Sequence, residues 1–214
     1  MASLNREKNW DFDAGLLPLD FTNTAEWHAR SDPIENLNSY ADLVSWSWKA
    51  GLLTEKAAQS LLETAERRPQ DARRALDRVI ELREALYRIF SHRAAGTQIP
   101  NEDLASFNAA LGEALHRVRL DASRDGFSWG WSDDNQNLEA MLWPILWKSA
   151  ELLTSEDLKR VGECADDRGC GYLFYDNSRN HSRRWCSMES CGNRAKVQRH
   201  YQRSKTQDEN LDGG

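Results

Sequence analysis

The first 163 residues contain no cysteine, and no part of the chain carries an apolar run of membrane-spanning length. The best candidate, Leu138–Trp147, is short and contains Glu139 and Pro144, whereas a spanning helix needs about 20 mainly apolar residues. The first ten residues lack the apolar segment of an export signal. We therefore expect a cytoplasmic protein that neither crosses nor binds a membrane.

Signatures of catalysis are missing as well. The sequence has no nucleophile elbow, phosphate-binding loop or HExxH motif. Its carboxylate pairs, such as Asp133–Asp134 and Asp166–Asp167, are adjacent in sequence and are read as solvated charges. The sequence therefore favours a protein that is not an enzyme, and a catalytic pocket in the N-terminal part is the least favoured alternative.

Charge of each sign is unevenly distributed. The 214 residues carry a formal charge of −6, which taken whole should repel nucleic acid. Residues 1–158, however, hold 17 basic and 26 acidic residues, whereas residues 159–205 hold 11 basic and 5 acidic ones. The last nine residues add three acidic side chains and no basic one. An acidic domain is thus followed by a basic module, and only that module is suited to nucleic acid.

All four cysteines lie in the basic module, at Cys164, Cys170, Cys186 and Cys191. In a small secreted protein such a group could form disulfides. Here it follows a cysteine-free domain without an export signal, so metal binding is the better interpretation. Two local pairs separated by a loop suit the tetrahedral preference of Zn²⁺. We predict one structural zinc ion per chain, with all four cysteines as ligands.

The N-terminal part is predicted to be mainly α-helical with a small β-sheet. Leu16–Thr24 reads as a short buried strand, and the hairpin signal Asp125-Gly126 joins two further strands. Thr54 is expected to cap the second helix and Asn101 the fourth, whose apolar positions are Leu104, Phe107, Leu111 and Leu115. The predicted helices are Ser39–Ala50, Thr54–Arg68, Asp71–Ala95, Asn101–Leu115 and Leu138–Leu153; the paired strands are Arg117–Ala122 and Phe127–Ser132.

The cysteine module is predicted to be a treble-clef-like finger. Gly171–Tyr175 has the composition of a strand, and Arg183–Trp185 is expected to return as its partner. Residues Asn193–Lys205 contain no Gly or Pro and are expected to form a helix, with Ala195, Val197 and Tyr201 turned partly towards the finger. The predicted divisions are residues 1–160, residues 161–205 and a disordered acidic tail at residues 206–214.

Basic side chains make the finger a candidate for DNA binding. Lys196, Arg199 and Arg203 share one helix face by their spacing, and guanidinium groups bind phosphates bidentately. The alternative is a solvated basic face on a zinc module that docks on its own acidic domain. The predicted DNA-binding residues are Arg179, Arg183, Arg184, Arg194, Lys196, Arg199 and Arg203.

A small-molecule site is predicted in the N-terminal part. Polar residues Asp20, Asn23 and Thr24 end the first predicted strand and lie close to Trp27, a combination that can line a pocket. Arg83 lies on or beside the apolar face of the longest helix and needs an anionic partner, either Asp20 or a ligand carboxylate. Capped turns, a core tryptophan and a structural ion pair are the simpler alternatives.

The sequence also resembles two known families. Cys191-Gly-Asn-Arg194 matches the signature of the CGNR zinc-finger proteins, and Ser178–Met188 and Arg194–Tyr201 are similar to the same family. Upstream, Leu19–Thr24 and Leu82–Tyr87 resemble the ABATE domain that usually precedes this finger in bacterial proteins. The likeness extends from about Leu16 to Lys205.

This resemblance implies a stress-induced bacterial transcription regulator, with an N-terminal sensing domain and a zinc-dependent DNA-binding end. A finger that binds RNA or protein and has no operator is the alternative. A single short finger covers little DNA, so a homodimer on two half-sites would be physically suitable. The ligand and the target sequence are not encoded in any pattern that we identify.

Overall fold

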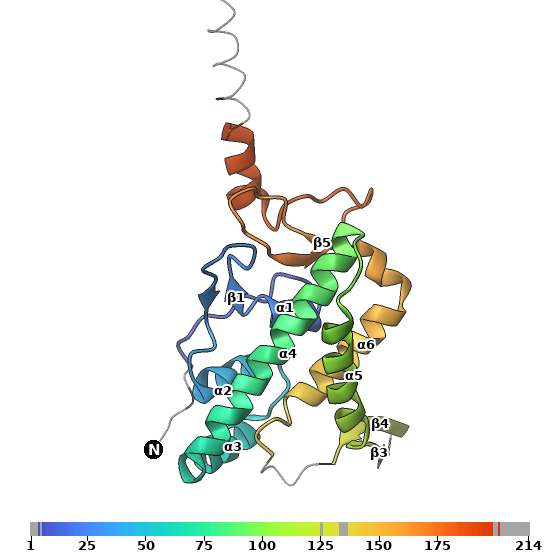
Figure 1. Cartoon of the computed structure of the whole chain (residues 1–214). Helices are drawn as coiled ribbons and strands as arrows, with labels where there is room; N and C mark the ends of the chain where they lie inside the picture. The colour runs from blue at the N-terminus through green and yellow to red at the C-terminus, as the bar shows by residue number, and fades with distance from the viewer. Residues whose placement is uncertain (1–3, 5, 125, 133–136, 199–200, 202–214) are drawn as a thin grey trace, which may run out of the picture.

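The computed structural model describes residues 4, 6–124, 126–132, 137–198 and 201, and these form helices with three two-stranded sheets (Figure 1). The predicted class, a mainly α-helical domain with small sheets followed by a four-cysteine finger, is confirmed. Within the described residues no helix is both long and apolar enough to span a bilayer. The elements are α1 (Leu17–Thr22), β1 (Ala25–Glu26), β2 (Ile34–Glu35), α2 (Tyr40–Lys49), α3 (Glu55–Arg67), α4 (Pro69–Ala95), α5 (Asn101–Leu115), β3 (Val118–Ser123), β4 (Gly126–Trp131), α6 (Leu142–Thr154), the 3₁₀ helix η1 (Glu156–Arg160), β5 (Val161–Glu163), β6 (Leu173–Tyr175), the π-helical turn η2 (Met188–Gly192) and a terminal helix at 193–198.

Helix α4 is the central element of the N-terminal domain. It packs against α1, α2, α3 and α5, and it also contacts β5 and β6 of the finger. Val79, Leu86 and Phe90 are buried along its length, as their helical spacing predicts. Gly96 ends the helix at a φ of +67°, a left-handed conformation that glycine adopts without strain. Because α4 contacts both parts of the chain, it positions the finger on the domain.

The predicted N-caps are correct for α2 and α3 and wrong for α5, although the predicted range of α5, Asn101–Leu115, is confirmed. The hydroxyls of Ser39 and Thr54 accept hydrogen bonds from the first turns of α2 and α3. Asn101, predicted as a cap, is instead the first residue of α5, and Pro100 precedes it in an extended conformation.

The predicted apolar face of α5 is also partly wrong. Leu104 and Leu115 are exposed, because the buried face is formed by Asp103, Phe107, Ala110 and Ala114. Small alanines let the helix backbones approach closely, and Asp103 is neutralised there by Arg88.

The segment Leu16–Thr24, predicted as a strand, contains helix α1 instead. Pro18 fits the first turn of a helix, where its missing N–H is not needed. The hydroxyls of Thr22 and Thr24 donate to carbonyls of the preceding turn. Every residue from Pro18 to Thr22 is buried, so the segment has no exposed face. Without one, hydrophobic periodicity cannot distinguish a helix from a strand.

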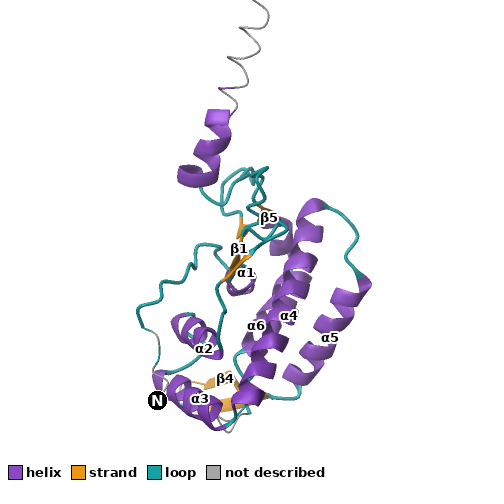
Figure 2. Cartoon of the chain, turned by 60° about the vertical axis from the view of Figure 1, so that its left-hand side comes forward, coloured by secondary structure: helices purple, strands orange, loops and turns teal. Residues whose placement is uncertain are grey.

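The β3–β4 hairpin is confirmed, and its tryptophans pack as its register predicts. Leu120 pairs with Trp129 and Val118 with Trp131, so both indoles project from the same face. Trp131 lies 6.2 Å from Trp143, ring centre to ring centre, on α6. Helix α6 begins at Leu142, later than the predicted Leu138, so that Pro144 lies in its first turn, where its missing N–H costs no helical hydrogen bond. The hairpin lies at the end of the molecule opposite the finger (Figures 1 and 2).

Strand β6 is paired on both edges, on one edge within the finger and on the other with the N-terminal domain. On one edge β6 pairs antiparallel with β5, and not with Arg183–Trp185, so that predicted pairing is wrong. On the other edge the amide side chain of Asn23 donates to Leu173 O at 2.8 Å and accepts from Leu173 N at 3.0 Å. Asn23 thus takes the place of a neighbouring strand on this edge. On the opposite edge β5, which precedes Cys164, takes the place predicted for Arg183–Trp185.

Arg83 is the centre of a buried polar network, and its partners are not the predicted Asp20. Its guanidinium forms two hydrogen bonds to Glu35, at 2.7 and 2.6 Å, and also contacts Glu84 at 2.7 Å. A further bond at 3.3 Å reaches the hydroxyl of Thr24. The Arg83 side chain is only 2% exposed, and the carboxylates of Glu35 and Glu84 replace the water that its charge loses on burial. The structural ion pair is the alternative that the geometry favours.

We predict that replacing Arg83 by Met lowers the free energy of unfolding by about 2–4 kcal/mol, because Glu35 and Glu84 are left facing each other without a cation. Arg74→Met is the matched control: Arg74 is exposed and pairs with Asp71, and its loss should cost less than about 0.5 kcal/mol. Urea denaturation followed by circular dichroism measures both. Equal costs for the two variants would contradict the structural role of the network.

Candidate metal centre and interdomain cavity

The four cysteine sulfur atoms converge on one point. Cys164 follows β5 and Cys170 precedes β6, so the loop of this hairpin holds the first pair. Cys186 lies just before η2, and Cys191 lies within that π-helical turn. All four Sγ atoms lie within 4.8 Å of one another, with 3.8 Å between Cys170 and Cys186 and 3.5 Å between Cys186 and Cys191. Zn–S bonds of about 2.3 Å in a tetrahedron require sulfur separations of about 3.8 Å, so the residues fit one zinc ion.

The thiols also need a cation for electrostatic reasons. Hydrogen bonds from Cys170 and Cys186 lower the pKa of Cys164, while the hydrogen bond to Cys164 raises the pKa of Cys170. Burial raises the pKa of Cys191 to about 12. One thiolate therefore forms readily, and the other thiols resist ionisation beside it. A bound divalent cation removes this resistance, because it stabilises the negative charge of all four thiolates.

Charged and aromatic groups next to the cysteines hold the finger in place. The guanidinium of Arg194 donates to Cys191 Sγ at 2.9 Å and to Asp166 at 3.3 Å. Asp166 also pairs with Arg168, whose guanidinium holds the pKa of Asp166 well below its usual value. Both arginines lie near the ring of Trp27, at 5.8 and 5.6 Å from its centre, and Trp27 belongs to the N-terminal domain. This group supports the thiolates and joins the two domains.

Two glycines that follow ligands have different roles. Gly171, after Cys170, has a φ of +64°, and a Cβ there would lie 2.6 Å from Ala29 N and from the Tyr87 hydroxyl. Gly192, after Cys191, lies in η2, where a Cβ would come 2.8 Å from the Met188 sulfur. Left-handed backbone is therefore the reason for the first glycine only, and close packing accounts for the second.

Comparison with known families agrees with this geometry. The ABATE family, described as "Putative stress-induced transcription regulator", matches residues 15–156, and the CGNR zinc finger matches residues 160–204. The chain belongs to the ABATE family. Its C-terminal part is a CGNR zinc finger, with four cysteines placed to bind one zinc ion. Neither description is that of an enzyme family. No curated protein matches the chain.

The predicted DNA-binding residues of the CGNR finger fall into three groups. Arg179, Arg184 and Lys196 are exposed. Arg183 donates to the carbonyls of Trp185, Tyr175 and Cys186 and lies 4.4 Å above the Phe174 ring. Arg194 is exposed, but its guanidinium is bound to Cys191 and Asp166 of the finger. Arg199 and Arg203 lie outside the described residues, as does the predicted tail, 206–214.

The residues predicted to bind a small molecule are only partly brought together. Asn23, Thr24 and Trp27 line one cavity of about 580 Å³, which lies between the ABATE domain and the finger. Arg83 does not line it, and its charge is already balanced by Glu35 and Glu84. Asp20 is buried beside the N-terminal arm, where its carboxylate accepts a hydrogen bond from Ala14 N at 3.0 Å.

Sequence reasoning missed the wall that the N-terminal arm contributes to this cavity. Residues Asn9–Asp13 form that wall, opposite Cys170, Tyr172, Cys186 and Cys191 of the finger. The signal available in the sequence was the alternation of aromatic and acidic residues, Trp10-Asp11-Phe12-Asp13. Asp166, two residues after Cys164, was likewise taken as solvated, although it pairs with both Arg168 and Arg194.

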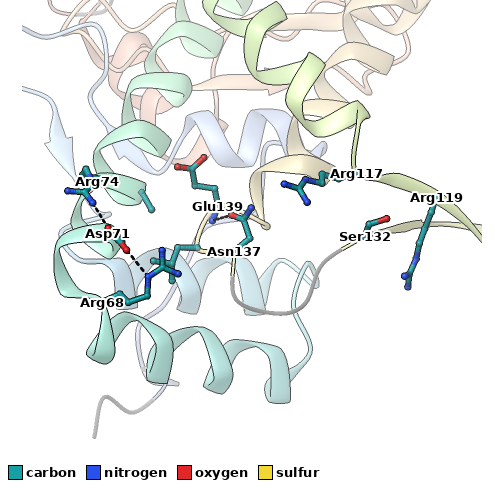
Figure 3. A pocket seen from close by; sticks show the side chains of 10 residues that line it. Arg68, Asp71, Arg74, Arg117, Arg119, Ser132, Asn137 and Glu139 are labelled. Carbon is teal, nitrogen blue, oxygen red and sulfur yellow. Dashed lines mark hydrogen bonds and ion pairs between the residues drawn. The ribbon is translucent and has the colours of Figure 1, made fainter.

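A second hollow of about 790 Å³ lies near the β3–β4 hairpin and is rich in arginine (Figure 3). Its cations are already engaged. Asp71 accepts hydrogen bonds from Arg68 and Arg74, Arg119 pairs with Asp121 at 3.0 Å, and the guanidinium of Arg117 lies 5.7 Å from the Trp143 ring centre. This hollow is therefore a weaker candidate for ligand binding than the interdomain cavity.

We predict that Cys186→Ser abolishes stoichiometric zinc binding, because three sulfurs leave the tetrahedron incomplete. Inductively coupled plasma mass spectrometry should find about one zinc ion per wild-type chain and only a small fraction of that in the variant. The finger should lose its structure while the far-ultraviolet signal of α2–α6 persists. Ser182→Ala, at an exposed finger residue, should retain its zinc; unchanged zinc content in Cys186→Ser would overturn the ligand set.

Asp20 predicts a pH dependence of stability. Burial raises the pKa of this carboxyl from 3.8 to about 7. The folded state thus binds the proton more tightly than the unfolded state, and ionisation of Asp20 lowers stability progressively as pH rises from about 4 to about 7. Asp20→Asn removes this ionisation and keeps an oxygen to accept from Ala14.

The stability advantage of Asp20→Asn over the wild type should grow by about 2 kcal/mol between about pH 5 and about pH 8. Urea unfolding at both pH values measures it. Asp32→Asn, at an exposed position, serves as the control with no such growth. A wild-type-to-variant difference that is constant with pH would show that Asp20 does not titrate in this range.

Proposed function

We propose that this ABATE protein is a cytoplasmic, DNA-binding transcription regulator whose CGNR finger contacts phosphates and whose N-terminal domain binds a small molecule. The observation that carries the proposal is that the finger holds the exposed basic residues Arg179, Arg184 and Lys196. The last helix of the finger projects away from the acidic domain (Figures 1 and 2). An acidic body would repel DNA, so only the finger end would approach it.

The proposed contact surface, which we call the basic face, is smaller than the set predicted from sequence. Its described members are Arg179, Arg184 and Lys196, which are exposed. Arg199 and Arg203 lie outside the described residues, and only their sequence spacing from Lys196 adds them to the proposed set. Arg183 and Arg194 are excluded from the basic face. The guanidinium of Arg183 donates to carbonyls of the finger, and that of Arg194 donates to the sulfur of Cys191 and to the carboxylate of Asp166. We assign them to positioning the finger rather than to DNA.

An alternative function is favoured by a separate observation at the end of the finger. Val197 and Tyr201, expected to turn partly towards the finger, are instead 61% and 77% exposed. An exposed apolar residue and an exposed tyrosine this close in sequence are suited to a protein groove or to stacking on unpaired RNA bases. A finger that binds RNA or protein without an operator therefore remains the second candidate.

A homodimer would complete the regulator. One finger presents few basic residues, and two copies related by a twofold axis would contact two half-sites. Dimerisation is part of the proposal, and its direct check is the mass of the zinc-loaded chain in solution.

For DNA binding we expect a steep loss of affinity with added salt. Each phosphate contact should contribute about −0.9 to the slope of log K against log[salt]. Arg184→Ala and Lys196→Ala should each reduce the slope by about one contact, as measured by fluorescence anisotropy on duplex DNA. Lys148→Ala, which removes an exposed cation of α6, should change nothing. Affinity that does not depend on salt would exclude phosphate contacts.

Selection from randomised pools distinguishes the two candidate functions. A regulator should enrich a common sequence from a duplex DNA pool, whereas the alternative predicts enrichment only from single-stranded RNA or none at all. Val197→Ser with Tyr201→Ser should leave duplex affinity nearly intact if the basic face binds DNA, and should abolish RNA or protein binding if the apolar pair is the contact.

A further inference from the structure

We propose that the interdomain cavity binds an organic cation with an aromatic or other flat apolar body, and that this ligand touches both the ABATE domain and the zinc finger. The inference deepens the sensing half of the proposed function and rests on it for its regulatory meaning. The cavity, of about 580 Å³, has the size of ordinary small-molecule sites.

Aromatic side chains form much of the cavity wall. Trp10 and Phe12 come from the arm, Trp46 from α2 and Tyr172 from the finger. Phe12 and Trp46 contact each other, with ring centres 5.9 Å apart. Ring faces attract cations as well as flat apolar groups, and the protein already uses this interaction at the cavity edge: Lys8 lies 4.4 Å from the Trp10 ring centre, and Arg30 lies 3.8 Å from that of Trp27.

The carboxylates of this region determine the sign of the ligand charge. Asp11, Asp13 and Glu26 line the cavity. The carboxylate of Asp20 accepts from Ala14 N, the residue after Asp13, and the charges of Asp11 and Asp13 both raise the pKa of Asp20. Among the described residues none of these three aspartates forms an ion pair. Elsewhere in the domain buried carboxylates are neutralised by arginine, as Asp103 is by Arg88.

The finger side of the cavity is negative too. Cys170, Cys186 and Cys191 line it, and a zinc ion held by four thiolates carries a net charge of −2. Arg194 is the lining cation, and its guanidinium is bound to Cys191 and Asp166. The cavity therefore favours a cation over an anion from both walls.

The location gives such a ligand a route to the finger. One wall belongs to the arm, to residues 23–27 that follow α1 and to Trp46 of α2, and the other belongs to the loops that hold the zinc ligands. A ligand that fills the space would fix the separation of the two walls, and through Cys186 and Cys191 it would alter the presentation of η2 and the terminal helix that follows.

Three compounds of one shape and different charge test the proposal on the zinc-loaded full chain: 1-naphthylmethylammonium, 1-naphthylmethanol and 1-naphthoate. Isothermal titration calorimetry should give an affinity for the ammonium about tenfold or more above that for the alcohol, and the weakest binding for the carboxylate. Equal affinities for ammonium and alcohol, or tighter binding of the carboxylate, would overturn the assignment.

The double variant Asp11→Asn/Asp13→Asn locates the binding. It should lose about tenfold of the ammonium affinity and keep the alcohol affinity, which shows that the cavity is intact. Asp32→Asn is the matched exposed control and should behave as wild type. If the double variant binds the ammonium as well as wild type does, the cation lies elsewhere and the proposal fails. Without probe, the variant should bind duplex DNA like wild type, so failure of DNA binding and failure of this inference remain distinguishable.

Discussion

The convergence of four sulfur atoms within 4.8 Å is the constraint on which the rest of the C-terminal architecture depends. The finger, residues 160–204, has little apolar core of its own, and the metal centre holds its loops together. The metal fixes the loop between β5 and β6 and the π-helical turn η2, from which the terminal helix continues. Burial and crowding prevent the four thiols from ionising together unless a divalent cation is bound. Zinc is therefore the element that orders the finger and fixes the position of its terminal helix.

The second constraint is that the finger and the ABATE domain are built as one unit. Asn23 substitutes for a strand beside β6, and Tyr175 N donates to Ala14 O at 2.8 Å. A polar chain also crosses the boundary: His28 stacks on Tyr87, whose hydroxyl donates to Glu163 at 3.2 Å, and Glu163 directly precedes Cys164. A change near the cavity can therefore reach the zinc ligands through packed, hydrogen-bonded groups.

The sequence predicted the parts of this molecule that depend on local chemistry. Cysteine spacing located the metal centre, and Asp125-Gly126 and the long apolar stripe of α4 located the hairpin and the central helix. It failed where tertiary contacts decide. Helix α1 is buried on all sides and so shows no period, and β6 pairs with β5 because the first ligand pair occupies the turn between them. The internal use of Arg183 and Arg194, and the cavity wall from the arm, depend on distant partners that no local pattern encodes.

Hydrogen–deuterium exchange of the full chain with and without a zinc chelator tests the central claim most directly. Removal of zinc should speed exchange throughout residues 164–198, including the amides of Leu173 and Tyr175, which donate across the domain boundary. The amides of α4 and α5 should stay protected. A finger that keeps its protection without zinc, or an α4 that loses protection together with the finger, would contradict the account.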